Sequence, residues 1–254
     1  MTASTLSANP FSIQARNLTV SYGASPVLWN VDVDIPSRGL TGIIGPNGAG
    51  KSTFLKAVLG MIPVTAGEVQ ISNQAGKQLK GDQIGYVPQR NTVDWDFPTS
   101  VFDVVMMGTY GRLRWFQRPG KNEREETWRA LELVQLQDFA DRQIGELSGG
   151  QQQRVFIARA LVQNASVYLL DEPFAGVDAK TEKSILEILQ SLRQEGCSVV
   201  MVHHDLSRAQ EYFDHIVMLN GRLISSGSTK NAFTDDAVQR CYGCPYNSLV
   251  TIGS

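Results

Sequence analysis

A lysine and a serine close a glycine-rich stretch at the spacing that phosphate-binding loops use. The segment Gly45-Pro46-Asn47-Gly48-Ala49-Gly50-Lys51-Ser52 fits the pattern G-x-x-x-x-G-K-[ST], in which backbone N–H groups wrap phosphate oxygens at the start of a helix. Lys51 is expected to neutralise the β- and γ-phosphates of a nucleotide, and the Ser52 hydroxyl to ligate Mg²⁺. A glycine-rich turn without a ligand is the alternative, and the position of the segment between an apolar strand and a helix disfavours it.

Two adjacent acids follow a short apolar strand later in the chain. The strand covers Val167 to Leu170, and Asp171 and Glu172 come directly after it. Parallel α/β sheets open onto their ligands at this end of their strands. Asp171 suits the coordination shell of Mg²⁺, and Glu172 suits the acceptance of a proton from the water that attacks a γ-phosphate. Acids at a strand end are often merely solvated, but the phosphate loop earlier in the chain favours the functional interpretation.

A second group of small residues precedes a predicted helix. Ser148, Gly149 and Gly150, within Leu147-Ser148-Gly149-Gly150-Gln151, would offer another set of N–H donors to an anion, although one nucleotide does not need two such sets. This segment matches in all five positions the signature motif of the ATP-binding cassette (ABC) ATPases, and the chain resembles that family over nearly its whole length. In that family two cassettes pack head to tail, so that the signature of one chain completes the phosphate site of the other. The resemblance therefore implies a second copy of the chain as a partner, with ATP and Mg²⁺ as cofactors.

The resemblance also implies roles for residues outside these three motifs. Tyr22 resembles the aromatic residue that stacks on adenine, and Gln89, at the end of Tyr86-Val87-Pro88-Gln89, resembles the glutamine that senses Mg²⁺ and the membrane partner. Asp178 corresponds to the acid of the loop that links the two sites. His204 matches the histidine that contacts the γ-phosphate, while His203 takes a position that usually carries a small polar residue. Alone, Tyr22 would be an ordinary strand-end aromatic and His204 a structural imidazole, and the order of all six motifs favours the functional interpretation.

The predicted site residues fall into four groups. Glu172, His204 and Gln89 are the expected catalytic residues, and the expected Mg²⁺ ligands are Ser52, Gln89 and Asp171. ATP binding is expected at Tyr22, Gly45, Pro46, Asn47, Gly48, Ala49, Gly50, Lys51, Ser52 and Thr53. The residues expected to act on the nucleotide of the partner subunit are Ser148, Gly149, Gly150 and Gln151, with Asp178 linking the two sites.

Short apolar strands that alternate with helices must position these residues. Alternating and apolar runs predict strands over 13–20, 27–35, 39–44, 167–170 and 198–202, and helical spacing predicts helices over 52–59, 122–139, 149–162 and 181–195. This alternation indicates a mainly parallel α/β sheet, with the first two strands forming an antiparallel edge layer. The resemblance implies a P-loop NTPase (RecA-like) core with an inserted α-helical subdomain. A single ABC ATPase domain is expected over 1–254, with its antiparallel layer and first core part in 1–88, the helical subdomain in 89–160, and the second core part and tail in 161–254.

Composition excludes several classes of function. The chain has 254 residues, 42% of them hydrophobic, and its 23 Lys and Arg against 25 Asp and Glu give a net charge of -2, without the basic excess typical of nucleic-acid binding. The apolar runs are far too short to cross a bilayer, and no secretory signal or transit peptide is visible. Three cysteines indicate no disulfide scaffold. Cys241 and Cys244 form a C-x-x-C that lacks an evident second ligand pair for zinc unless His215 or a partner chain supplies it; two small tail residues are the alternative.

The segment between Gln89 and Ser148 is expected to be the subdomain that, in the family, touches membrane-spanning subunits. Exposed Trp, Phe and Arg side chains are typical of interface anchors, so we expect a docking surface for a permease loop. Interleaved arginines and aromatics also suit nucleic acid, which the overall acidity disfavours. The residues concerned are Trp95, Asp96, Phe97 and Pro98, then Val101 to Met107, then Arg112, Arg114, Trp115, Phe116 and Arg118.

Within the family, the amino-acid sequences of this segment, of 172–178 and of 202–205 most resemble those of the ATPases of bacterial manganese, zinc and iron importers. Manganese is the first expectation, with a separate permease and a metal-binding protein selecting the metal, and with this chain on the cytoplasmic face of the membrane. A soluble cassette acting on ribosomes or chromosomes would ordinarily carry two cassettes or a long coiled-coil insertion, and neither is visible. A regulatory subunit with a degenerate site is disfavoured by the intact Glu172 and His204.

Overall fold

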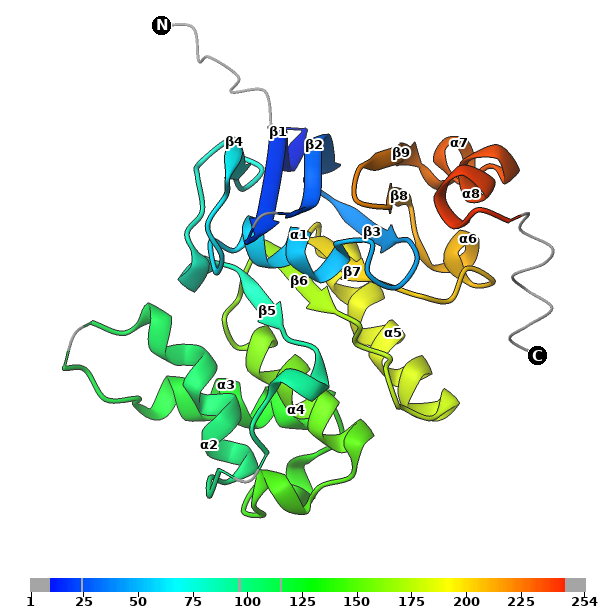
Figure 1. Cartoon of the computed structure of the whole chain (residues 1–254). Helices are drawn as coiled ribbons and strands as arrows, with labels where there is room; N and C mark the ends of the chain where they lie inside the picture. The colour runs from blue at the N-terminus through cyan, green and yellow to red at the C-terminus, as the bar shows by residue number, and fades with distance from the viewer. Residues whose placement is uncertain (1–9, 24, 96, 115, 245–254) are drawn as a thin grey trace, which may run out of the picture.

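The structure is a computed structural model that describes residues 10–23, 25–95, 97–114 and 116–244. Figure 1 shows two β-sheets packed together, with helices α2, α3 and α4 gathered at one end and α6, α7 and α8 near the C-terminus. The mainly parallel core, the antiparallel layer and the group of helices that the sequence predicts are all present. No helix of the described residues is both long and apolar enough to pass through a bilayer.

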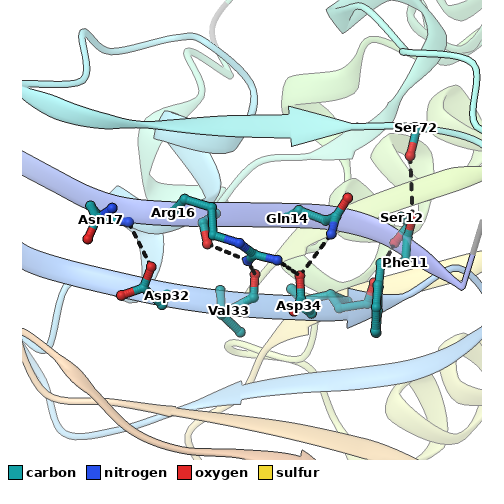
Figure 2. A network of polar contacts seen from close by, with 11 residues as sticks. Phe11, Ser12, Gln14, Arg16, Asn17, Asp32, Val33, Asp34 and Ser72 are labelled. Atoms are coloured by element: carbon teal, nitrogen blue, oxygen red, sulfur yellow. Dashed lines mark hydrogen bonds and ion pairs between the residues drawn. The ribbon is translucent and has the colours of Figure 1, made fainter.

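The antiparallel sheet has the order β2-β1-β4, with β1 at Phe11–Tyr22, β2 at Ser25–Pro36 and β4 at Ala66–Ile71. The predicted pair of strands is confirmed, and β4 is a third strand beyond them. Figure 2 shows the polar contacts that join β1 to β2: Asp34 accepts hydrogen bonds from Arg16 at 2.6 Å and from Gln14 at 3.1 Å, and Asp32 accepts one from the Asn17 backbone at 2.9 Å. Arg16 and Asn17 lie within the irregular pairing between Ala15 and Leu18, and Gln14 lies just before it, so these contacts join the two strands where their regular pairing is interrupted.

The second sheet has six strands in the order β5-β6-β7-β3-β8-β9, parallel except for the antiparallel β9. Its strands are β3 (Gly39–Ile44), β5 (Gly85–Val87), β6 (Val167–Asp171), β7 (Ser198–Val202), β8 (His215–Leu219) and β9 (Leu223–Ser228). Alternate residues of β7 serve different layers: Val200 and Val202 pack toward the antiparallel sheet, and Val199 and Met201 pack toward the helices of the other face. The sheet is therefore buried on both faces, as a parallel sheet requires.

Helices cover both faces of this sheet. The α-helices are α1 (Lys51–Val58), α2 (Val101–Met106), α3 (Lys121–Leu133), α4 (Gly149–Leu161), α5 (Ala179–Gln194), α6 (Ala209–Tyr212), α7 (Thr229–Ala232) and α8 (Asp235–Tyr242). Short 3₁₀ turns lie at Gly81–Gln83, Arg90–Thr92, Met107–Arg112, Gln137–Phe139 and Ile144–Glu146. The predicted helices over 52–59, 149–162 and 181–195 agree with α1, α4 and α5 within two residues at each end.

Two expectations about the helical segment are wrong. The helix predicted over 122–139 ends at Leu133, because Gln135 adopts a left-handed conformation with φ of 57° that no α-helix can contain. Trp95, expected as an exposed anchor, is half-buried: its ring meets the Phe156 ring edge-on with centroids 5.2 Å apart, and its Nε1–H donates to the Arg90 carbonyl at 3.0 Å.

The interpretation of Cys241 as a small residue of a tail is also wrong. Cys241 lies in the last turn of α8 and is 1% exposed, its thiol donates to the Leu219 carbonyl at 3.5 Å, and the Asn220 side chain donates to its carbonyl at 2.9 Å. Burial raises the pKa of the Cys241 thiol to about 11. Within the described ranges no three His, Cys, Asp or Glu side chains gather as a metal site. The helix α8, which carries Cys241, therefore packs against the core.

Candidate nucleotide site

Three parallel strands end side by side where the predicted site residues lie. Pairing places Asp171 of β6 opposite Val202 of β7, and Val202 opposite Ile43 of β3. The His203 backbone N–H also donates to the Ile43 carbonyl at 3.0 Å, which holds the chain after β7 beside β3. The loops that carry the phosphate-binding segment, Glu172 and His204 therefore leave the sheet at one edge.

The phosphate loop is closed around Lys51. Gly50, just before α1, has a φ of 89°, and a Cβ there would lie 2.6 Å from Cδ2 of Leu28, so this position needs glycine. No side chain caps the start of α1, so the N–H groups of its first turn remain for an anion. Lys51 Nζ donates to the carbonyls of Gly45 at 2.8 Å and Pro46 at 2.9 Å, and burial lowers its pKa while Glu172 opposes that shift.

Ser52 and Asp171 form a pair of oxygen ligands beside this loop. Ser52 Oγ donates to Asp171 Oδ1 at 2.8 Å. Asp171 is 1% exposed, and burial raises the pKa of its carboxyl while the hydrogen bond from Ser52 opposes the shift. A buried carboxylate next to a hydroxyl is the donor set that a hard cation prefers, and a cation would offset the cost of burying that charge. The pair therefore fits Mg²⁺.

Gln89 and Glu172 meet at the same edge. Val87 of β5 pairs with Leu170 of β6, so the residues two positions later lie side by side. Gln89 Nε2 donates to Glu172 Oε2 at 2.9 Å, which leaves the amide oxygen of Gln89 as the atom that would reach a cation. Glu172 has a φ of 52°, an uncommon conformation for this residue type, and such backbone strain is concentrated at functional sites.

The two histidines after β7 have different surroundings. His203 is 3% exposed, its ring lies 5.7 Å from the Phe174 ring, 5.9 Å from Tyr212 and 5.7 Å from Phe213, and burial lowers its pKa to about 4. Its Nε2 has no hydrogen-bond partner in the described part of the chain. His204 is exposed and touches this cluster through a ring contact of 5.7 Å with His203. His204 is thus the histidine accessible to a ligand, and His203 is a neutral member of the core.

The signature segment starts α4. Ser148 is the N-cap: its Oγ accepts from the Gln151 backbone at 3.4 Å, and its own N–H donates to Gln151 Oε1 at 2.8 Å. Asp178 caps α5 in the same way, accepting from the backbone and hydroxyl of Thr181, both at 2.9 Å, and these bonds lower its pKa. Thr181 lies 3.3 Å from the point where Gly150 would carry a Cβ. The signature and Asp178 are therefore neighbours, and no hydrogen bond of the described residues joins them to the phosphate loop of the same chain.

Comparison with known proteins decides the family. The family model described as ABC transporter matches residues 28–175, more than half of the chain. This chain belongs to the ABC transporter family.

Two relatives of this ABC protein are matched over nearly their whole lengths. The zinc transport system ATP-binding protein TroB of Treponema pallidum is 52% identical, over 94% of this chain and 89% of that protein. The manganese transport system ATP-binding protein MntB of Bacillus subtilis is 51% identical, over 92% of this chain and 93% of that protein. An ATP-binding cassette solved as a dimer, in a post-hydrolysis state bound to ADP and Pi, superposes with a TM-score of 0.73 at 30% identity, covering 85% of this chain and 98% of that one. The fold class and the ATPase activity expected from the sequence are confirmed.

In this ABC ATPase the structure gathers Lys51, Ser52, Gln89, Asp171 and Glu172 into one connected site. Tyr22 stands apart from them at the end of β1, and its side chain is 55% exposed.

The sequence analysis missed three contacts made around the candidate residues. Thr181 holds Asp178, and its place three residues after an acid is a capping pattern that could have revealed it. Arg90, directly after Gln89, contacts the signature helix through Gln152 at 3.1 Å. The turn after β8 supports the phosphate loop, because the Gly221 N–H donates to the Ala49 carbonyl at 3.0 Å, and no local sequence signal announces that contact.

Proposed function

We propose that this chain powers the uptake of a divalent metal ion, manganese first, through a separate integral membrane permease. The observation that carries the hydrolytic part is the junction of Lys51, the Ser52–Asp171 pair and the Gln89–Glu172 pair at one sheet edge. The choice of metal rests on the two relatives: MntB is named as part of a manganese transport system and TroB as part of a zinc transport system. Zinc or iron is the alternative cargo, and a soluble non-transport cassette is the second alternative.

In the proposed mechanism each residue has a separate task. Lys51 exchanges its two carbonyl partners for phosphate oxygens, so the energy of desolvating its charge is recovered when the nucleotide binds. Ser52, Asp171 and Gln89 would hold Mg²⁺, which neutralises phosphate charge when it is bound. Glu172 accepts the proton of the attacking water, Gln89 fixes the orientation of that carboxylate, and His204 contacts the γ-phosphate. Tyr22 stacks on adenine, and the glycines from Gly45 to Gly50 bring the backbone close to the phosphates.

The position of the signature supports a head-to-tail dimer. Ser148 is exposed at the start of α4, where the positive end of the helix dipole favours an anion. We propose that this anion is the γ-phosphate bound to the partner subunit, with Asp178 linking the two sites. The single-domain organisation with divisions at 88 and 160 stays part of this proposal.

An apolar groove in the helical layer suits a loop of the permease. It has a volume of about 240 Å³, and one of its lining residues, Phe97, is 58% exposed. The groove is lined by Val93, Asp94, Phe97, Thr99, Val104, Met107, Ile144, Phe156 and Arg159. Asp96 and Trp115, expected on the same docking surface, lie outside the described residues. We propose that this groove holds the chain on the cytoplasmic face of the membrane, and that a metal-binding protein reaches it only through the permease.

Replacement of Lys51 by alanine should lower ATP affinity and turnover together. The variant removes a fixed cation from phosphates that remain charged throughout the cycle, so binding is expected to weaken about 10-fold or more. Equilibrium binding of a fluorescent ATP analogue measures this, with Lys56→Ala on the same helix as the control. If Lys51→Ala bound MgATP as tightly as the parent, Lys51 would not be the phosphate lysine.

The transport proposal is tested in membranes and in cells. The tagged chain should co-purify with integral membrane subunits from detergent-solubilised membranes of its source. Cells that lack the chain should lose uptake of radioactive manganese, regain it with the parent and not with Lys51→Ala. Loss of zinc or iron uptake with intact manganese uptake would identify the other cargo, and the absence of membrane partners would favour a soluble cassette.

A further inference from the structure

Arg90, the residue after Gln89, connects the sheet edge that carries Glu172 to α4, the helix that begins with the signature segment. Arg90 Nε donates to Gln152 Oε1 at 3.1 Å, and Gln152 itself is 4% exposed. The guanidinium also lies against the backbone of Gly149, because a Cβ at Gly149 would come within 2.9 Å of the Arg90 Cζ and Nη1 atoms. Arg90 therefore packs directly on the first residue of α4, next to Ser148.

The contact is held from both ends. On the α4 side, Gln152 Nε2 donates to the Ile144 carbonyl at 3.2 Å, which fixes the amide that receives Arg90. On the other side, the Arg90 carbonyl accepts from Trp95 Nε1 at 3.0 Å, and the Trp95 ring meets Phe156, one turn further along α4. Arg90 is thus anchored to α4 by its side chain and, through Trp95, by its backbone.

Arg90 is also joined by a peptide bond to Gln89, which contacts Glu172. Gln89 Nε2 donates to Glu172 Oε2 at 2.9 Å, so an unbroken line of contacts runs from Glu172 through Gln89 and Arg90 to Gly149. The guanidinium also places a positive charge beside the N-terminus of α4, which carries the positive end of the helix dipole. This arrangement is unfavourable in the isolated chain and becomes favourable when an anion arrives there.

We propose that Arg90 is a positioning residue that couples the two nucleotide sites of the dimer: it holds the start of α4 in place for the nucleotide of the partner subunit, according to the state of Glu172 in its own subunit. The proposal rests on the head-to-tail arrangement proposed above. Arg90 acts through Gln152 and Gly149 and is not itself a catalytic residue.

The first experiment compares Arg90→Ala, Arg90→Lys and the control Arg142→Ala, which removes an exposed arginine of the same helical layer that stacks on Phe139. Arg90→Ala should bind MgATP within about twofold of the parent, lose about 10-fold in kcat, and show a Hill coefficient for ATP that falls toward about 1. Arg90→Lys should recover most of kcat, since it keeps the charge and a donor. Unchanged thermal unfolding midpoints separate this effect from misfolding. Parental kcat and Hill coefficient in Arg90→Ala would overturn the proposal.

The second experiment asks which site Arg90 serves. In a mixed dimer of a Lys51→Ala chain and a Ser148→Arg chain, one site keeps both its phosphate loop and its signature, and that signature belongs to the Lys51→Ala chain. Adding Arg90→Ala to the Lys51→Ala chain should lower the activity of this site about 10-fold, because the effect crosses the interface. No loss there, or a loss only when Arg90→Ala is added to the Ser148→Arg chain, would contradict the coupling.

The bond itself is tested by a double-mutant cycle. Arg90→Ala and Gln152→Ala should not be additive, so the double variant should be no slower than the slower single variant. Additive losses would mean that the hydrogen bond between them does not carry the effect. A parent chain that neither hydrolyses ATP nor dimerises with MgATP would instead refute the proposed function, whatever Arg90 does.

Discussion

Glu172→Gln should bind ATP normally and hydrolyse it about 10² to 10⁴ times more slowly than the parent, because the amide keeps the shape of the side chain but cannot accept a proton. The hydrogen bond from Gln89 survives, since the new side chain still has an oxygen in the place of Oε2. ATP that bridges two subunits would no longer be cleaved. The variant should therefore accumulate as an ATP-dependent dimer, whereas the parent dimerises only transiently.

Single-turnover hydrolysis and size-exclusion chromatography with and without MgATP measure the two halves of this prediction. Glu132→Gln, on the exposed face of α3, makes the same chemical change away from the site and should behave as the parent. A loss of only a few fold would mean that Glu172 orients the water without accepting its proton. Near-parental turnover with no trapped dimer would remove Glu172 from the role of general base.

Ser148→Arg should abolish hydrolysis while each subunit still binds ATP. The side chain is exposed at the start of α4, and a long cation there would obstruct the γ-phosphate held by the partner subunit. The substitution also removes an N-cap, which costs about 1 kcal/mol of stability. Ser100→Arg removes the equivalent cap of α2, where Ser100 accepts from the Asp103 backbone at 3.1 Å, and serves as the control for that loss.

Mixing Ser148→Arg with Lys51→Ala tests the geometry. We expect neither variant to be active alone, but half of the dimers formed at random contain one chain of each kind, and each of these has one intact site. The mixture should therefore recover about a quarter of the parental ATPase rate if the sites act independently. A mixture as inactive as its components would rule out a head-to-tail site.

The parts of the site that the sequence predicts are those that lie close together along the chain. The phosphate loop, the Asp171–Glu172 pair and the signature each occupy a few consecutive residues, so local spacing carries their chemistry. The contact between Gln89 and Glu172 depends on β5 lying beside β6, which is a property of the strand order. The contact between Arg90 and Gln152 could not be predicted for the same reason, since it depends on how α4 packs.

The fold shows a similar division. Long periodic segments such as α4 and α5 are predictable. β4 and β9 are not, because their exposed positions blur the apolar pattern, and β5 has only three residues. β8 is an apolar run of five residues, as β6 and β7 are, so its local pattern could have revealed it. The early end of α3 depends on the left-handed Gln135, which the apolar periodicity through Val134 conceals. Tertiary contacts decide these boundaries, and local propensity does not encode them.

The strand order has a consequence for how the protein is made. β3, the strand that leads into the phosphate loop, pairs with β7 and β8. The first residue of these two strands, Ser198, comes 154 positions after Ile44, so β3 has no pairing partner until that part of the chain has been synthesised. A ribosome adding roughly 5–20 residues per second needs about 8–30 s to reach it. Throughout that interval the nascent chain carries a largely apolar strand with two unpaired edges, while β1 and β2 can already pair. A nascent chain in this state exposes strand edges that are prone to aggregation until Ser198–Val202 has been added and can pair with β3.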